Sequence, residues 1–296
     1  MRVLTRGDLD GLTSVVLLTE VHPISEIRFA HPKDVQDGEV EVTADDIIVN
    51  LPFVPGCGLW FDHHVSEDRK LKSIGHFEGR FEVAPSTARV IYNHYNKPEF
   101  DQYDDMLEET DRLDSGSLSV EDVTDPKRWI LLGLTLDPRT GLGPEFRKYF
   151  RWLVEYVKEV SLAKVLQHKE VSKRIDRVLA EQEAFKMVLK AHSVLDETVV
   201  VTDLRGVSDV PVGNRFLVYT LFPESNVDLR IFGGKLGNTV LAAGHSIFNR
   251  TCNVNVGDLF SSLGGGGHRS AGTCQVPNER AEETIDLVLE TLKANK

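Results

Sequence analysis

Two aspartates near the start of the chain, Asp8 and Asp10, are spaced so that both carboxylates can face one crevice. They come directly after Arg2–Thr5, a short run that is typical of a β-strand. Ligands collect at the carboxyl ends of strands in α/β proteins, and paired carboxylates there suit hard divalent cations such as Mg²⁺ and Mn²⁺. The pair therefore predicts a metal site, and a simple Gly-Asp turn is the alternative.

A second polar cluster, Asp62-His63-His64, follows another apolar run, Leu59-Trp60-Phe61. An imidazole beside a carboxylate shifts the preference of a metal site from Mg²⁺ toward Mn²⁺. One histidine can bind the metal while the next faces the substrate, as a general acid or as a phosphate contact. Polar surface residues at the start of a loop are the alternative.

A third cluster, Gly264–Gly272, contains a run of consecutive glycines followed by His268 and Arg269. Glycines let a backbone approach a ligand closely and turn its N–H groups toward an anion, and the two basic residues add charge for a phosphate. The segment lacks the Gly-Lys-Ser/Thr ending of a Walker loop. It predicts a phosphate-binding loop centred on Gly265, Gly266 and Gly267, with a flexible hinge as the alternative.

The first half of the chain supplies the elements that must position these clusters. Ile47–Val49 reads as a buried strand that ends at Asn50, and the run before Asp62 reads as another. Helix-compatible patterns cover residues 12–20, 86–95 and 103–113. Strands that alternate with helices predict a parallel sheet covered on both faces.

The second half of the chain has a different pattern of apolar residues, glycines and prolines. Residues 145–205 contain no glycine or proline, and their apolar residues recur at near-helical intervals, which predicts one or two long amphipathic helices. A coiled-coil partner helix is the competing interpretation. Beyond about Leu195, β-rich runs (198–202, 216–222, 227–232 and 239–243) and helix-like segments (256–263 and 279–292) predict a mixed α/β domain. The expected fold is thus α/β in two lobes, with domains at 1–150 and 196–296 and a helical connector at 151–195.

Composition narrows the class of protein. The 296 residues suggest about two domains, and a hydrophobic content of 41% excludes a wholly disordered chain. A formal net charge of −12 counts against a broad surface for duplex nucleic acid, but not against a nucleotide held in a local pocket. With no apolar run long enough to span a bilayer, no signal-peptide pattern and three scattered cysteines, we expect a cytoplasmic enzyme.

In combination and order, the three clusters resemble the DHH phosphoesterases with a C-terminal DHHA1 domain, over nearly the whole chain. That family includes RecJ-type exonucleases, nano-RNA and phosphoadenosine-phosphate phosphatases, cyclic-dinucleotide phosphodiesterases and exopolyphosphatase-like proteins. The resemblance implies an N-terminal parallel-sheet DHH domain that binds one or two Mn²⁺ ions, with Mg²⁺ as the other choice. It also implies a mixed-sheet DHHA1 domain that binds the substrate through the glycine-rich loop.

The resemblance further implies roles for single residues. Asp8, Asp10 and His63 would bind metal, and His64, with Asp62 and Asp10, would act on the scissile phosphate. Metal-activated water would attack a phosphodiester or a phosphoanhydride. His268 and Arg269 would bind the substrate, and Arg250 is a further candidate for a phosphate contact.

Two positions compete for the last metal-binding aspartate. Asp114 lies at about the family's usual distance after the histidines, whereas Asp137 lies in a segment that looks like the family's Asp-Thr element. We favour Asp114 and keep Asp137 as the competitor, together with Arg139, which is also a candidate substrate contact.

Two departures from the family pattern bear on the metal. Leu4 stands where the family often has a histidine, and Asn50 stands where it has an aspartate that bridges two metals. An amide oxygen is neutral and is a poorer ligand for a dication than a carboxylate. We therefore expect one ion, held by Asp8 or Asp10 with His63 and Asp114, to bind better than a second one, with Asn50 as a weaker ligand.

Two functions remain open. The first is a Mn²⁺-dependent phosphoesterase acting on a short oligonucleotide, a nucleotide phosphate or a short polyphosphate. The second, motivated by the departures above, is a metal-poor relative that binds a nucleotide as a sensor or regulatory module. In either case we expect a small phosphorylated partner or a short single strand, no long duplex and no membrane, and a homodimer is compatible with both.

Overall fold

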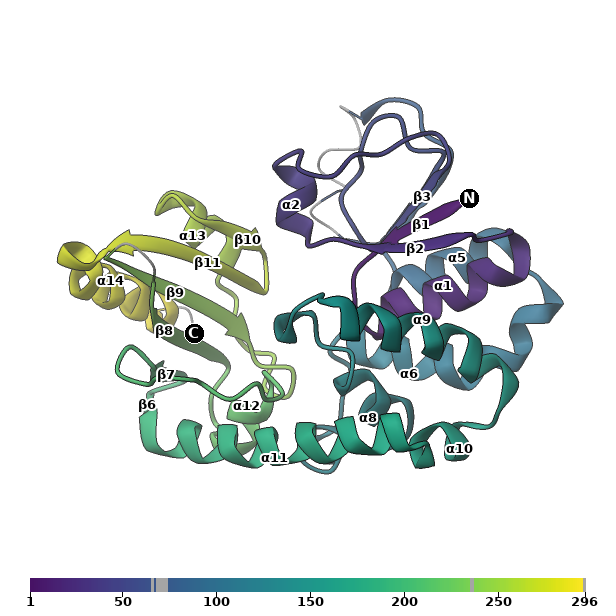
Figure 1. Ribbon diagram of the computed structural model, residues 1–296. Helices are drawn as coiled ribbons and strands as arrows, with labels where there is room; N and C mark the ends of the chain where they lie inside the picture. Colours follow the sequence, from purple (N-terminus) through teal and green to yellow (C-terminus); the bar gives the residue numbers. More distant parts are fainter. Residues whose placement is uncertain (65–66, 68–73, 235–236, 295–296) are drawn as a thin grey trace. The chain divides into compact units, whose positions relative to one another are not determined.

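The computed structural model describes residues 1–64, 67, 74–234 and 237–294. The chain divides into two compact units, one made of Met1–Ser117 and Pro126–Arg177 and the other of Leu118–Asp125 and Val178–Lys296 (Figure 1). Each unit has its own sheet and its own hydrophobic core, which confirms the α/β class and the two-lobed organisation. None of the helices in the described part of the chain is long and apolar enough to cross a membrane.

The first unit is built on a five-stranded parallel sheet in the order β2-β1-β3-β4-β5. Its strands are β1 (Arg2–Thr5), β2 (Glu26–Phe29), β3 (Asp46–Val49), β4 (Leu59–Asp62) and β5 (Gly79–Phe81). The parallel sheet predicted from the sequence is confirmed. Because β1, β3 and β4 are neighbours that run the same way, their carboxyl ends lie together at one edge.

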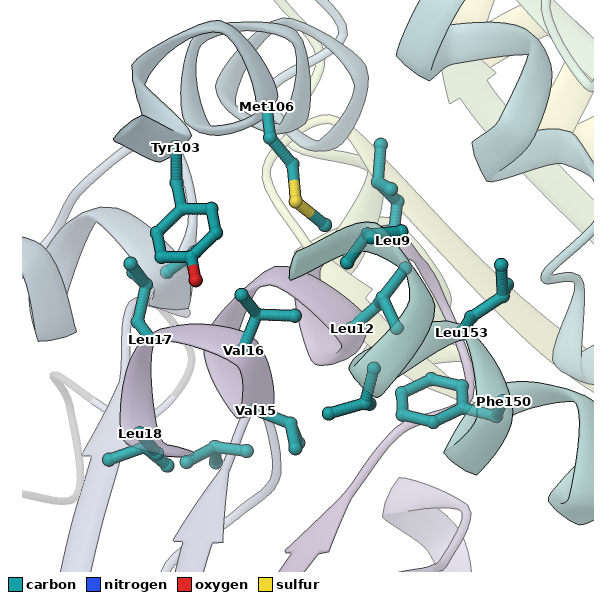
Figure 2. Packing of buried hydrophobic residues seen from close by; sticks show 14 of the residues in the cluster. Leu9, Leu12, Val15, Val16, Leu17, Leu18, Tyr103, Met106, Phe150 and Leu153 are labelled. Atoms are coloured by element: carbon teal, nitrogen blue, oxygen red, sulfur yellow. The ribbon is translucent and has the colours of Figure 1, made fainter. Parts of the chain in front are cut away.

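Helices gather on one face of this sheet, where Val3, Ile47 and Phe61 join a core with residues of the helices. The helices that contribute include α1 (Leu9–Val21), α5 (Thr87–Tyr95), α6 (Asp104–Asp114), α8 (Arg128–Leu134) and α9 (Pro144–Glu159). Figure 2 shows α1 packed between Tyr103 and Met106 on one side and the α9 residues Phe150 and Leu153 on the other. Residues 9–18 of α1 are all buried, so apolar side chains occur all around this stretch of the helix, together with buried polar ones such as Asp10.

The opposite face of the sheet carries a smaller cluster. Leu4, Ile48 and Trp60 alternate with the residues above, as the two-residue period of a strand requires, and pack with Val35 of α2 (Pro32–Gln36). Both faces are therefore covered, as expected, but by several helices on one side and by a short helix and loop residues on the other. Leu4 is 1% exposed within this apolar cluster, which explains why the position carries leucine.

The segment 145–205 contains two long helices, as expected, but a short helix separates them and two strands follow. It continues α9 and then forms α10 (Leu162–Gln167), α11 (Lys169–His192) and the strands β6 (Ser193–Asp196) and β7 (Val199–Asp203). The backbone leaves the helical region at Val160 and at His168, where ψ is 157° and 134°. These breaks allow Val157, Val165 and Val171 all to reach the same core. Since the sequence carries no glycine or proline at either break, we attribute the positions of the two breaks to packing against this core.

The second unit contains a six-stranded mixed sheet in the order β10-β11-β9-β8-β7-β6, in which only β7 and β8 pair in parallel. Its remaining strands are β8 (Val227–Gly233), β9 (Asn238–His245), β10 (Gly266–His268) and β11 (Ala271–Pro277). Phe260 of α13 (Val256–Ser262) and Val288 of α14 (Ala281–Ala294) pack on this sheet. The mixed-sheet second domain predicted from the sequence is confirmed.

The sequence pattern predicts the wrong kind of element for one β-rich run in this unit. Residues 216–222 contain the helix α12 (Leu217–Leu221) instead of a strand. A short run of consecutive apolar residues fits either structure by its pattern alone. Tertiary contacts decide it, since α12 packs on α7 (Val120–Thr124) and Tyr219 donates a hydrogen bond toward Asp228 Oδ1 and Gly244 O.

Candidate metal centre

Polar residues stand at the ends of three neighbouring parallel strands. Asp8 follows β1, Asn50 follows β3, and β4 ends at Asp62 with His63 and His64 directly after it. Asn50 has a φ of 56°, a left-handed conformation that asparagine tolerates better than most residues. Backbone strain of this kind is typical of functional positions.

Asp10 lies in the first turn of α1 and is 2% exposed. Its Oδ2 accepts a hydrogen bond from Thr87 N at 3.0 Å and its Oδ1 accepts one from Ala88 N at 2.8 Å, so the start of α5 holds both oxygens. Burial, and then the charge of Asp114, raise the pKa of Asp10 to about 7. A nearby cation would stabilise the ionised form of such a carboxyl.

His63 is oriented by its backbone contact. Its Nδ1 lies 2.9 Å from Ala84 O, so Nδ1 carries the hydrogen, and Nε2 faces two acids, 3.1 Å from Asp114 Oδ2 and 3.9 Å from Asp10 Oδ2. Burial disfavours the charged ring, but Asp114 and Asp10 outweigh it and raise the pKa of His63 to about 10. The protonated ring therefore balances the two acids, and a divalent ion bound at Nε2 would replace that proton.

Asp114 is the last residue of α6. Burial alone would raise the pKa of Asp114, but the hydrogen bond from His63 holds it below its usual value. Ligand atoms of Asp10, His63 and Asp114 all lie within 4.8 Å of one another. Two carboxylates and an imidazole form a donor set that could hold one divalent ion of the Mn²⁺ type.

His64 and Asp62 form a second pair next to this donor set. His64 Nδ1 lies 2.8 Å from Asp62 Oδ1; the Asp62 side chain is 1% exposed and that of His64 is 36% exposed. Although burial opposes the charged ring, the hydrogen bond to Asp62 raises the pKa of His64. Because Nδ1 is held by Asp62, Nε2 of this partly exposed ring is the atom that can meet a ligand.

Asn50 Oδ1 and Asp62 Oδ2 are buried at this edge and have no hydrogen-bond partner among the described residues. Buried polar atoms are normally paired, so acceptors left open beside a carboxylate–imidazole cluster need an explanation. A bound cation would explain these open acceptors, because carboxylate and amide oxygens coordinate divalent cations directly. The residues present therefore fit a divalent ion.

Asp8 is engaged differently from Asp10. Its Oδ1 accepts hydrogen bonds from Gly11 N at 2.9 Å and from Asn50 Nδ2 at 3.0 Å, while Arg6 Nε lies 3.2 Å from Oδ2. Asp8 thus caps α1, and it belongs to neither of the donor groups found in the described part of the chain. The carboxylate also orients the Asn50 amide, because a reversed amide would direct its oxygen at Asp8.

Asp137 belongs to neither of the donor groups found among the described residues. Asp137 caps a short 3₁₀ helix, Pro138–Thr140, and pairs with the Arg139 guanidinium and backbone N–H. The structure therefore brings Asp114, rather than Asp137, to His63. Arg139 is held by its local acid in this arrangement.

The glycine-rich segment of the second unit is a hairpin, whereas the sequence suggested a loop. β10 and β11 pair across a turn at Arg269 and Ser270. A Cβ at Gly265 would lie 2.2 Å from Thr273 O and one at Gly267 would lie 2.3 Å from Ala271 O, so close packing of backbones requires glycine at both positions. A Cβ at Gly266 would meet nothing within 4 Å, so packing does not explain glycine there.

The basic residues proposed as substrate contacts lie on the surface of this unit. His268 and Arg269 are exposed at the tip of the hairpin, where Ser270 N donates to His268 Nδ1. Arg250 is exposed and its Nε donates to Ile247 O.

Sequence reasoning did not single out two contributors to the centre, Arg6 and Ser86. Ser86 caps α5, the helix whose first N–H groups hold Asp10. A serine before a helical pattern is a recognisable start signal, but its link to Asp10 is visible only in the fold. Arg6 could have been noticed as a basic residue two positions before the acidic pair of Asp8 and Asp10.

Comparisons with known proteins place the fold. No protein-family model and no curated protein sequence matches the chain. A solved structure of the pGpG-specific phosphodiesterase PggH from Vibrio cholerae matches with 34% identity and a TM-score of 0.84, covering 100% of this chain and 99% of that one. RecJ from Thermus thermophilus, in complex with Mn²⁺, matches with 13% identity and a TM-score of 0.59; the match covers 52% of its chain and shows a shared fold.

Proposed function

The chain belongs to the DHH/DHHA1 phosphoesterase family, and from that premise we propose that it is a metal-dependent phosphodiesterase that hydrolyses a small nucleotide. The observation that carries the proposal is the convergence of Asp10, His63 and Asp114, with ligand atoms within 4.8 Å of one another. A regulatory module that only binds a nucleotide would not need this donor set. The orphaned oxygens of Asn50 and Asp62 support the same conclusion.

We assign the ion to Asp10, His63 and Asp114, and we propose Mn²⁺, with Mg²⁺ as the second choice, because an imidazole is part of the set. The ion would supply Lewis acidity, which activates water and draws charge from the phosphate. The start of α5 and the Ala84 carbonyl hold two of the three ligands in place. Removal of such supporting contacts typically weakens metal binding by roughly 10- to 100-fold.

His64 is the residue we assign to the leaving group. In hydrolysis, water gives up one proton to solvent as its oxygen bonds to phosphorus, the bond from phosphorus to the leaving oxygen breaks, and that oxygen takes up a proton. Asp62 holds His64 Nδ1, which leaves Nε2–H for contact with the phosphate and for donation of that proton. Asp62 therefore acts as a positioning residue.

The substrate we propose is a linear dinucleotide such as pGpG, the substrate named for PggH. We propose that Gly266, His268 and Arg269 of the hairpin contribute phosphate contacts, because the last two are exposed and basic and the first is a glycine that packing does not require.

The test is hydrolysis of pGpG, pApA and bis(p-nitrophenyl) phosphate by the purified chain with Mn²⁺, Mg²⁺ or EDTA. His64→Gln is expected to lower kcat roughly 10²- to 10⁴-fold, the usual contribution of a general acid, with Mn²⁺ content unchanged. His76→Gln is the matched control, since the side chain of His76 is 87% exposed and pairs with Glu78. Equal turnover by wild type and Asp10→Asn on every substrate would contradict the proposal.

A further inference from the structure

Arg6 is a basic side chain at the edge of an acidic centre. Its Nε lies 3.2 Å from Asp8 Oδ2, and its side chain remains 30% exposed. The charge of Asp8, and then those of Asp114, Asp10 and Asp62, raise the pKa of Arg6 against the effect of burial. In return, the charge of Arg6 helps to lower the pKa of Asp114. The guanidinium is therefore within electrostatic reach of the whole centre.

Asp8 has little capacity left for a metal ion. One oxygen already accepts two hydrogen bonds, from Gly11 N and Asn50 Nδ2, and the other pairs with Arg6. Both the amide nitrogen of Asn50 and the guanidinium would have to move before a cation could approach this carboxylate from their side. The negative charge of Asp8 is thus balanced by a residue of the chain itself.

In the donor set of Asp10, His63 and Asp114, one divalent ion is enough to balance the negative charge. Two carboxylates, Asp10 and Asp114, with a neutral His63 ring offset the two positive charges of a divalent cation. A phosphodiester brings a further negative charge into this pocket, and its charge increases during attack by water. Stabilising that charge requires positive groups that are already in place.

We propose that Arg6 is the second cation of this centre: Asp8 holds its guanidinium beside the ion of Asp10, His63 and Asp114, and the substrate phosphate binds to both. The proposal rests on the function proposed above. A guanidinium suits the role because its planar set of donors matches phosphate oxygens and because it keeps its charge at any working pH. One nitrogen is directed at Asp8, and the exposed part of the group can face a ligand.

The competing arrangement has a second divalent ion at Asp8, with Arg6 displaced. The two arrangements differ in metal stoichiometry, which can be measured without any turnover. After saturation with Mn²⁺ and removal of the free ion, elemental analysis of the wild type is expected to give one ion per chain. Two ions per chain would overturn the role of Arg6, whereas no ion would contradict the proposed function itself.

The contact with phosphate is tested by titrating the Mn²⁺-loaded protein with inorganic phosphate, following the broadening of the ³¹P resonance by the bound ion. Arg6→Gln is expected to weaken phosphate binding about 10- to 100-fold, the range for a lost charge-assisted hydrogen bond, and to retain one Mn²⁺ per chain. Arg6→Lys should restore part of the affinity. Arg80→Gln, which removes a 41% exposed arginine paired with Glu82, is the matched control.

The outcomes separate the possibilities. Unchanged phosphate affinity in folded Arg6→Gln overturns the proposal, as does loss of affinity to the same degree in Arg80→Gln. If Arg6→Gln does not fold, the phosphate affinity of Arg6→Lys and the number of Mn²⁺ ions per wild-type chain still test the proposal. A wild-type protein that binds one Mn²⁺ and phosphate through Arg6 but hydrolyses no diester would sustain this inference and reject the proposed activity.

Discussion

Ser86 Oγ donates a hydrogen bond to Asp111 Oδ1 at 2.6 Å while it accepts one from Arg89 N at 3.0 Å, so a single serine joins the start of α5 to α6. Arg89 strengthens the junction through Asp111 Oδ2 at 2.7 Å. The first two N–H groups of α5, those of Thr87 and Ala88, hold the Asp10 carboxylate, and α6 ends at Asp114. The junction therefore sets the position of two candidate ligands relative to each other.

Loss of this junction should weaken metal binding. Asp111→Ala removes the acceptor of both Ser86 and Arg89, and we expect the Kd for Mn²⁺ to rise about 10-fold or more, as for other residues that support ligands. Isothermal titration calorimetry on the folded variant measures the change. Asp105→Ala, which removes a 77% exposed acid paired with Arg128, is the control. A Kd equal to that of the wild type would show that the junction has only a structural role.

The choice between the two competing aspartates can be made by the same measurement. Asp114→Asn should raise the Kd for Mn²⁺ by more than about 100-fold, because it removes a charged oxygen 3.1 Å from His63 Nε2. Asp137→Asn should leave the Kd within about twofold, because that carboxylate pairs with Arg139. The reverse order of effects would assign the ion to Asp137.

Asp46 predicts a pH dependence of stability that does not involve the metal. It is fully buried at the start of β3, and although burial opposes ionisation, hydrogen bonds from Arg2 and Thr43 hold the pKa of Asp46 below its usual value. A carboxyl with a lowered pKa stabilises the fold above its unfolded pKa of about 3.9, and this contribution is lost as the pH falls through the folded value.

Asp46→Asn should therefore lower the free energy of unfolding by about 1–3 kcal/mol at pH 7, and the difference from the wild type should shrink toward pH 3. Urea denaturation of both proteins at the two pH values measures it. Asp45→Asn, which changes an exposed neighbour, is the control. A difference that stays constant with pH would mean that the pKa of Asp46 is the same in the folded and unfolded chains.

Adjacent glycines in the hairpin should respond differently to alanine. Gly265→Ala places a Cβ 2.2 Å from Thr273 O, a rigid backbone atom, and a clash of this kind costs about 1–3 kcal/mol, or a fall in Tm of roughly 2–12 °C. Gly266→Ala meets nothing within 4 Å and should leave Tm unchanged. If Gly266 contacts the substrate, its alanine variant should raise KM in the pGpG assay. Equal losses of Tm would contradict the packing account.

Local patterns were sufficient to predict β1, β3 and β4 and the polar residues that follow them, but they did not identify β2 or β5. The runs before Asp8, Asn50 and Asp62 are short and apolar and end in polar residues, and a parallel sheet necessarily brings such ends to one edge. The same patterns failed at α12 and at the breaks around Val160 and His168. At those places the local sequence is compatible with more than one structure, and contacts with distant residues select one.

The sequence by itself determined the family, the α/β class and the set of acids and histidines from which a metal centre can be built. Only the tertiary structure decided how that set is divided. It holds Asp10 and Asp114 against His63, but commits Asp8 to Asn50 and Arg6. The physical reason is that a carboxylate's capacity to bind a cation depends on which donors already occupy its oxygens. Those donors come from a helix start, a neighbouring strand and an arginine whose positions are set by the packing of the whole unit.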